Sequence, residues 1–174
     1  MFYIESERLR LIPLNTHQLH IYHQSEALAA ELGLSTINID MEPFFQSEFD
    51  DALQNFWLPF VEKNPDTYHW FTNWLIVLKE ENTAIGGIGL TGLPNENGES
   101  EVGYGVGLSY RGKGYATEAL VCISQWAFIH PGLYTIVAQT PVDLLSSQRV
   151  LQRAGFESVK ADNELLRWEL RRNA

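Results

Sequence analysis

The hydrophobic positions of the chain follow two periods, one typical of strands and the other of helices. Alternating or continuous branched and aromatic residues, bounded by glycine, proline and asparagine, indicate strands. Segments with this pattern lie at residues 8–13, 70–78, 83–93, 101–108, 134–138 and 164–170. We expect the second and third segments to form a hairpin, which Gly86, Gly87 and Gly89 loosen.

Two helices are predicted before the hairpin. Asn15 is expected to be an N-cap because Gln18 stands at the capping-box position, and the helix should run on towards Glu31. A second helix is indicated by apolar residues spaced for one helical face, namely Phe49, Leu53, Phe56, Trp57 and Phe60. Pro59 should kink or shorten it.

Two further helices are predicted after the hairpin. One spans residues 114–128 and carries an apolar inner face. Asp143 is expected to cap the other, in which Ser147, Val150, Leu151 and Ala154 share a face. Gly155 can end that helix in a left-handed turn, so that Phe156 folds back on it. This order of elements predicts a mixed α/β or α+β sheet in one domain, residues 1–174.

Composition and charge narrow the function. The chain has 174 residues, of which 45% are hydrophobic, enough for a core. A net charge of −10 argues against a nucleic-acid partner and mildly favours a cationic one. No stretch approaches the roughly 20 apolar residues of a membrane span, and residues 1–10 lack a signal-peptide pattern, so we expect no membrane partner and a cytoplasmic protein. The lone Cys122 is expected to pack in a core.

The most informative segment is the turn between the fourth strand and the third helix, which reads Leu-Ser-Tyr-Arg-Gly-Lys-Gly-Tyr-Ala-Thr over residues 108–117. Gly112 and Gly114 allow a tight turn, and the first N–H groups of a helix have no internal partners and favour anions. Arg111 and Lys113 add positive charge. The segment suits a phosphate or pyrophosphate, although a solvated surface turn has the same composition.

Two other phosphate motifs do not fit. From Gly107 the chain reads G-x-x-x-x-G-K-G, and the residue after the lysine is Gly114, where a P-loop needs the Ser or Thr that binds magnesium. The dinucleotide pattern G-x-G-x-x-G fails after Gly114 as well. We therefore expect neither a nucleotide hydrolase nor a dinucleotide enzyme.

The turn resembles the R/Q-x-x-G-x-G/A signature of the GNAT acetyltransferases, with Arg111, Gly114 and Ala116 at the signature positions. Three further segments resemble the ribosomal-protein N-terminal acetyltransferase subgroup of that family: S-E-R-L-R-L at 6–11, E-V-G-Y at 101–104 and S-Q-R-V-L-Q-R-A-G-F at 147–156. The four matches span nearly the whole chain in the expected order.

The resemblance implies a fold and a cofactor. The fourth and fifth strands should splay apart in a mostly antiparallel sheet flanked by helices. The pantetheine arm of acetyl-coenzyme A would lie in that gap against the backbone of Val106, Gly107 and Leu108. The pyrophosphate would bind at Arg111, Gly112, Lys113, Gly114, Tyr115, Ala116 and Thr117. No metal is implied.

Acetyl transfer to an amine needs a base, because an ammonium of pKa ~10.4 has no free lone pair. Glu101 matches a family base and could act directly or through water, or it could be a solvated strand-end residue. The tyrosine that many members use as an acid is Leu151 here. The subgroup's serine falls on Ser147, which could bond the coenzyme sulfur or only the helix backbone. The family's usual asparagine is Leu144, which puts one coenzyme contact in doubt.

The leading hypothesis is an N-acetyltransferase that moves an acetyl group to a primary amine by direct attack in a ternary complex. The amine would be a protein N-terminus or a small molecule, and the protein a monomer or homodimer. The alternative is a GNAT-like module that binds acyl-coenzyme A without turning it over.

Tyr104 either lines the cleft or packs in the sheet. His17, His20 and His23 share a helical face but have no obvious carboxylate partner, so a solvated face is expected.

Overall fold

The computed structural model describes residues 1–173, except for the side chains at 160 and 161. In this part of the chain nine strands form a sheet in the order β1-β2-β4-β5-β6-β7-β9-β8, and β3 pairs with β5 outside that path. The strands are β1 (Ile4–Glu5), β2 (Leu9–Pro13), β3 (Thr36–Ile37), β4 (Trp74–Leu78), β5 (Thr83–Leu90), β6 (Glu99–Val106), β7 (Thr135–Pro141), β8 (Glu157–Ala161) and β9 (Leu165–Arg171). Neighbours are antiparallel except for the parallel pairs β6–β7 and β3–β5.

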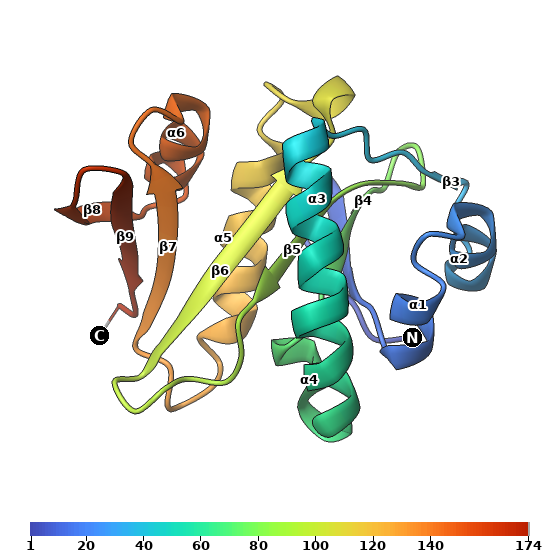
Figure 1. Cartoon of the computed structure of the whole chain (residues 1–174), viewed down its shortest axis with the longest axis horizontal. Coiled ribbons are helices and arrows are strands. Elements are labelled where there is room, and N and C mark those ends of the chain that lie inside the picture. The colour runs from blue at the N-terminus through green and yellow to red at the C-terminus, as the bar shows by residue number, and fades with distance from the viewer. Residues whose placement is uncertain (174) are drawn as a thin grey trace.

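Helices cover both faces of the sheet, which gives the mixed α/β fold expected from the sequence (Figure 1). They are α1 (Thr16–His20), α2 (Ser25–Leu32), α3 (Pro43–Ala52), α4 (Leu58–Lys63), α5 (Tyr115–Ala127) and α6 (Leu145–Arg153). In the view of Figure 1, α3 and α4 cross the front of the sheet, α5 lies behind it, and α6 stands beside the upper end of β7. Among the described helices, none is both long enough and apolar enough to cross a bilayer.

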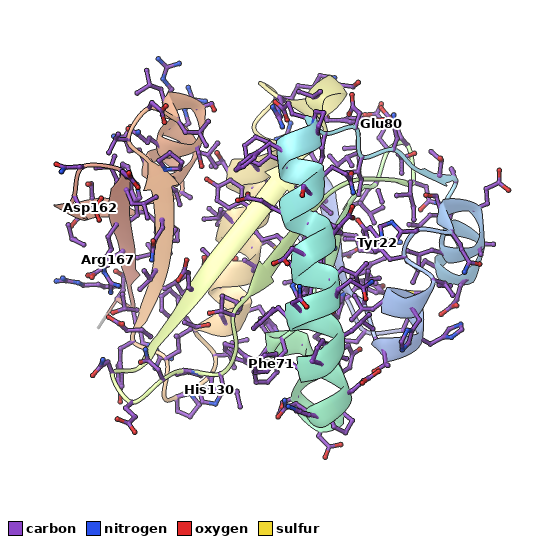
Figure 2. The ribbon with its side chains drawn as sticks, in the orientation of Figure 1. Tyr22, Phe71, Glu80, His130, Asp162 and Arg167 are labelled. Atoms are coloured by element: carbon purple, nitrogen blue, oxygen red, sulfur yellow. The ribbon has the colours of Figure 1, made fainter. Side chains whose placement is uncertain are left out.

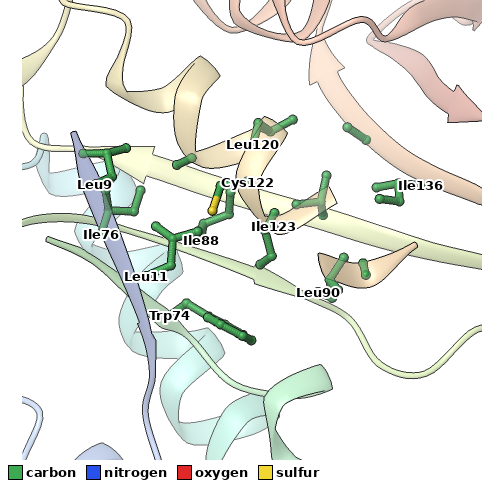
Figure 3. Packing of buried hydrophobic residues seen from close by; sticks show 14 of the residues in the cluster. Leu9, Leu11, Trp74, Ile76, Ile88, Leu90, Leu120, Cys122, Ile123 and Ile136 are labelled. Atoms are coloured by element: carbon green, nitrogen blue, oxygen red, sulfur yellow. The ribbon is translucent and has the colours of Figure 1, made fainter. Parts of the chain in front are cut away.

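Two apolar clusters hold the helices to the sheet. The larger joins α5 to the strands, and Figure 3 shows Trp74, Ile76 and Ile88 of the strands in one cluster with Ile123 of α5. Cys122 is buried in this cluster, and burial raises the pKa of its thiol to about 11, so it is a packing residue as predicted. The smaller cluster lies on the other face, under α1, α2 and the α3–α4 segment.

The predicted helix after β2 is correct at its start and wrong in its length. Asn15 accepts a hydrogen bond from the Gln18 N–H, and the Gln18 side chain accepts from the Asn15 N–H, each at 3.0 Å, which is the predicted capping box. The helix then ends at His20. The N–H groups of Tyr22 and Gln24 bond three residues back, which tightens the backbone into a turn before α2 begins.

The second predicted helix forms in two pieces around Pro59. Between α3 and α4 the backbone widens into a π-helical turn, Leu53–Trp57, and the N–H of Leu58 bonds to the Leu53 carbonyl. Proline has no N–H, and its ring collides with the carbonyl four residues earlier in a regular helix. The wide turn directly before Pro59 accommodates that collision, so the expected disturbance takes the form of a π turn rather than a break.

The predicted cap of α6 is wrong, whereas its end is confirmed. Leu144, not Asp143, is the N-cap, and no side chain bonds the first N–H groups; the Leu145 N–H bonds the Asp143 carbonyl instead. At the other end, Gly155 adopts φ 92° and the Phe156 N–H donates to the Leu151 carbonyl at 3.0 Å. Phe156 is buried, as the helix-end pattern predicted.

Candidate active site

β6 and β7 part in the middle of the sheet, which confirms the predicted splay. They pair at three successive positions, the last of which joins Glu101 to Val137. Beyond it β6 continues beside β5, whereas β7 stays with β9, and the gap widens towards the top of Figure 1. The Gly107 N–H donates to the Ile85 carbonyl of β5 at 2.8 Å. Because successive residues of a strand direct their backbone groups to alternate sides, the Val106 N–H points into the gap.

The turn between β6 and α5 leaves a row of backbone N–H groups without partners. It begins with a 3₁₀ turn, Leu108–Tyr110, and then passes through Gly112 and Gly114 at φ 76° and 82°. A Cβ at Gly112 would meet nothing within 4 Å, so the left-handed backbone, not crowding, is what favours glycine there. Within residues 1–173, no acceptor binds the N–H groups of residues 112–117. They lie at the positive end of the α5 dipole, where an anion is favoured.

The two cations of the turn have different surroundings. Arg111 donates to both carboxylate oxygens of Glu42 at 2.7 and 2.9 Å and to the Val106 carbonyl at 3.0 Å. The hydrogen bonds from Arg111 are the main reason that the pKa of Glu42 is lowered. This pair ties the start of α3 to the turn and balances the guanidinium charge. Lys113 lies 5.6 Å from the Tyr110 ring centroid and has no carboxylate within ion-pair distance among the described residues.

Two of the three residues predicted to hold pantetheine use their N–H groups inside the protein. The N–H of Gly107 bonds to β5, and that of Leu108 donates to the Asp40 carbonyl at 2.9 Å. Of the three, Val106 is the residue whose N–H is directed into the gap. Coenzyme contacts by Val106, Gly107 and Leu108 stay predictions, and Gly107 and Leu108 can contribute only through other atoms.

Glu101 lies on β6 at the last paired position, half-buried. Burial is the main reason that the pKa of its carboxyl is raised, and the positive charge of Arg167 acts in the opposite direction. Arg167, on β9 (Figure 2), makes ion pairs with Glu99 at 2.8 Å and with Glu169 at 3.1 Å. The face of β6 that carries Glu101 continues as Gly103 and Gly105, and a Cβ at Gly103 would meet nothing within 4 Å. A raised carboxyl pKa beside open strand suits a general base.

Ser147 and Tyr104 meet across the gap, on the other side of β6 from Glu101. Tyr104 shares its face of the strand with the buried Val102 and Val106. Its hydroxyl lies 2.9 Å from Ser147 Oγ of α6 and donates to the Ser147 carbonyl at 3.2 Å. Glu101 and Ser147 therefore stand on opposite faces of one strand. The alternation of residues along β6 could have indicated on which face of the strand Tyr104 lies. Its contact with Ser147 of α6 could not be predicted, because the two residues are far apart in the sequence.

The three histidines of the first helical segment are exposed, as expected, but each also has a carboxylate partner that the sequence did not indicate. His17 pairs with Glu31 of α2, His20 with Glu62 of α4 and His23 with Asp50 of α3, at 3.1, 3.3 and 3.6 Å. The partners come from three different elements, so the pairing was invisible in the local sequence. No group of three metal-binding side chains occurs within residues 1–173. The histidines are surface contacts between helices.

The sequence also matches those of known acetyltransferases. Residues 8–157 match the model of the "Acetyltransferase (GNAT) domain" family. The chain belongs to the GNAT acetyltransferase family. It is 32% identical to the uncharacterized N-acetyltransferase YjdG of Bacillus subtilis over 157 residues, 90% of each chain. This match covers the strand-turn-helix segment and the diverging strands described above.

Solved structures of GNAT proteins have the same fold. A putative ribosomal-protein-serine acetyltransferase from Vibrio cholerae superposes with a TM-score of 0.67 at 16% identity, covering 98% of both chains. RimL, a ribosomal L7/L12 alpha-N-protein acetyltransferase in complex with coenzyme A, gives 0.67 at 17% identity, again over 98% of both chains. At these identities the likeness shows the fold, and the ribosomal-protein subgroup stays a hypothesis.

Proposed function

We propose that this GNAT protein transfers an acetyl group from acetyl-coenzyme A to a primary amine. The observation that carries the proposal is the gap between β6 and β7 with unpaired N–H groups at its end. A diphosphate needs several donors in a concave turn, and a thioester arm needs an open strand edge. Here β6, whose edge borders the gap, leads directly into the turn that carries the N–H groups, so a single extended ligand can use both features.

The coenzyme would bind with its pyrophosphate on the backbone of residues 112–117. Lys113 adds a positive charge that pairs with no carboxylate within residues 1–173, whereas Arg111 contributes its backbone and fixes the turn through Glu42. The pantetheine arm would run into the gap and accept a hydrogen bond from the Val106 N–H. These residues also fit the cofactor sterically, because Gly112 presents bare backbone to open space. The bound coenzyme supplies the activated acetyl carbon.

The two faces of β6 separate the incoming and departing groups. An amine on the open Gly103 side would lose its proton to Glu101, directly or through water, and attack the acetyl carbon lying in the gap. The carbon–sulfur bond then breaks, and its electron pair leaves on sulfur towards Ser147 on the other face. Protein backbone at the gap would polarise the carbonyl. Direct transfer in a ternary complex follows, because no protein nucleophile is required.

The acceptor is proposed as a cationic primary amine, either a peptide N-terminus or a small molecule. The acidic net charge of −10 favours such a partner. RimL is named for an alpha-amino acceptor on ribosomal L7/L12, which places the peptide N-terminus among the first candidates. The bare glycines beside Glu101 leave room for either class of amine.

Turnover with a panel of amines tests the proposal. Acetyl-coenzyme A would be incubated with the protein and peptides with free or blocked N-termini, polyamines and amino acids. Released thiol and acetylated products would be measured by colorimetry and mass spectrometry. Thiol release matched mole for mole by an N-acetylated product supports the proposal. Tight coenzyme binding without release on any amine would contradict it and indicate a binding module.

A further inference from the structure

The Tyr104–Ser147 contact bridges the open part of the gap. Tyr104 comes from β6 and Ser147 from α6, and among the described residues no other side-chain hydrogen bond joins these two elements. In the described part of the chain, the strand pairing between β6 and β7 lies further down and ends at Glu101. The contact therefore sits where the proposed function puts the end of the pantetheine arm and the thioester.

Tyr104 is held as a hydrogen-bond donor. Its ring is packed against the larger core cluster, and its hydroxyl is half-buried, where a polar group needs a partner. Burial is the main reason that the pKa of its phenol is raised, although the bond to Ser147 acts the other way. The hydroxyl thus keeps its hydrogen at neutral pH and has two acceptors within reach, the Oγ and the carbonyl of Ser147, at 2.9 and 3.2 Å.

The choice between these acceptors decides what the serine can do. A hydroxyl has one hydrogen and can accept two bonds. When Tyr104 donates to the Ser147 carbonyl, the Ser147 hydrogen can turn back to the phenol oxygen. When Tyr104 donates to Oγ instead, the Ser147 hydrogen is released to point into the gap. A hydroxyl that accepts one hydrogen bond is also a stronger donor in the next, because chained bonds polarise one another.

We propose that Tyr104 positions and polarises the Ser147 hydroxyl as the donor to the sulfur of the departing coenzyme A. The inference rests on the proposed function and adds a positioning residue to it. The carbon–sulfur electron pair leaves with sulfur, and the Ser147 O–H hydrogen bond stabilises that thiolate. No bond to Tyr104 forms or breaks. The cationic amine loses two protons in becoming an amide: Glu101 takes the first, which frees the lone pair, and the second, lost from nitrogen after the attack, goes to the departing sulfur, so that coenzyme A leaves as the thiol.

Removal of the phenol hydroxyl tests the inference. Tyr104→Phe keeps the ring in the core and leaves only Ser147 without its donor. We expect kcat to fall roughly tenfold, the worth of one hydrogen bond, while coenzyme A affinity by titration changes less than about twofold. Tyr68→Phe, another partly buried tyrosine outside the gap, is the matched control and should keep wild-type kcat.

A double-mutant cycle separates positioning from a structural role. If Tyr104 acts through Ser147, Tyr104→Phe in a Ser147→Ala background should cost no further kcat. Wild-type kcat in Tyr104→Phe, or losses that multiply in the double variant, would overturn the inference. Ser147→Ala removes the other partner of the same hydrogen bond. If one of the two variants fails to fold, the other still tests the inference. Failure of the proposed function is distinct, because wild-type protein would then release no thiol.

Discussion

At the scale of single residues, the proposed chemistry depends on Glu101, whose carboxyl pKa is raised by burial. Glu101→Gln removes the proposed base but keeps its shape, so turnover should fall about a hundredfold or more. Coenzyme affinity should be unchanged because the turn of residues 112–117 is untouched. Glu96→Gln, an exposed change in the preceding turn, is the control and should behave as wild type in both assays. Equal turnover in all three proteins would remove Glu101 from the mechanism.

The pH dependence follows from the same carboxyl. Burial raises the Glu101 pKa above its ordinary 4.5, and a base works only when deprotonated. Activity should therefore be lost as pH falls through the raised pKa, with the acid limb of kcat/KM above pH 4.5.

The positive charge of Arg167 provides a second test of the acid limb of kcat/KM. Arg167 lowers the pKa of Glu101, so Arg167→Gln should move the acid limb to higher pH. Steady-state rates from acid to neutral pH measure both effects. An acid limb that stays in place in Arg167→Gln would contradict the assignment to Glu101.

Residue types and their spacing pointed to the turn, because it depends on local sequence, whereas Glu101 was indicated by the resemblance to the GNAT family. They could not give Tyr104 its partner on α6, or the carboxylates that meet the three histidines. Such contacts depend on elements far apart in the chain. Arg111 is the clearest case: its charge was predicted to face a phosphate, whereas the fold places Glu42 against it.

At the scale of elements, the proposed anion site combines the glycine turn with the start of α5. Gly112→Ala forces a side chain onto a backbone at φ 76°, which should cost about 1–2 kcal/mol of unfolding free energy and displace the N–H groups. Gly33, at the end of α2, has φ 66° and equally open surroundings, so Gly33→Ala is a matched control for strain.

Thermal unfolding and coenzyme titration distinguish the two glycine variants. Both should lose similar stability, but only Gly112→Ala should lose coenzyme affinity. Equal affinities for the two variants would show that the turn does not hold the coenzyme. The comparison separates a ligand site from an ordinary strained turn, since both glycines have the same backbone requirement.

Strongly periodic elements were predictable, and elements without a period were not. The buried strand β5 and the amphipathic α5 formed close to their expected bounds, whereas the strand expected over 70–78 begins only at Trp74, because Pro65–Trp70 forms a 3₁₀ helix. β8 was missed because its residues 157–159 are all exposed and give no alternation. The break between α1 and α2 was missed because the apolar spacing continues through it while the backbone changes direction.

At the scale of the whole molecule, the central claim is that parting of β6 from β7 creates the coenzyme site. Three features depend on the path of β6. This strand borders the gap, leads into the turn with the N–H groups of residues 112–117, and carries Glu101 on one of its faces. The pair between Arg111 and Glu42 joins this region to α3, so the site is fixed by both layers of the fold.

A crystal structure of the protein with acetyl-coenzyme A tests this claim most directly. We expect the diphosphate to lie within hydrogen-bond distance of the N–H groups of residues 112–117, the pantetheine arm beside Val106 and the sulfur facing Ser147. Coenzyme bound elsewhere, or a gap and turn that stay empty at saturating coenzyme, would contradict it.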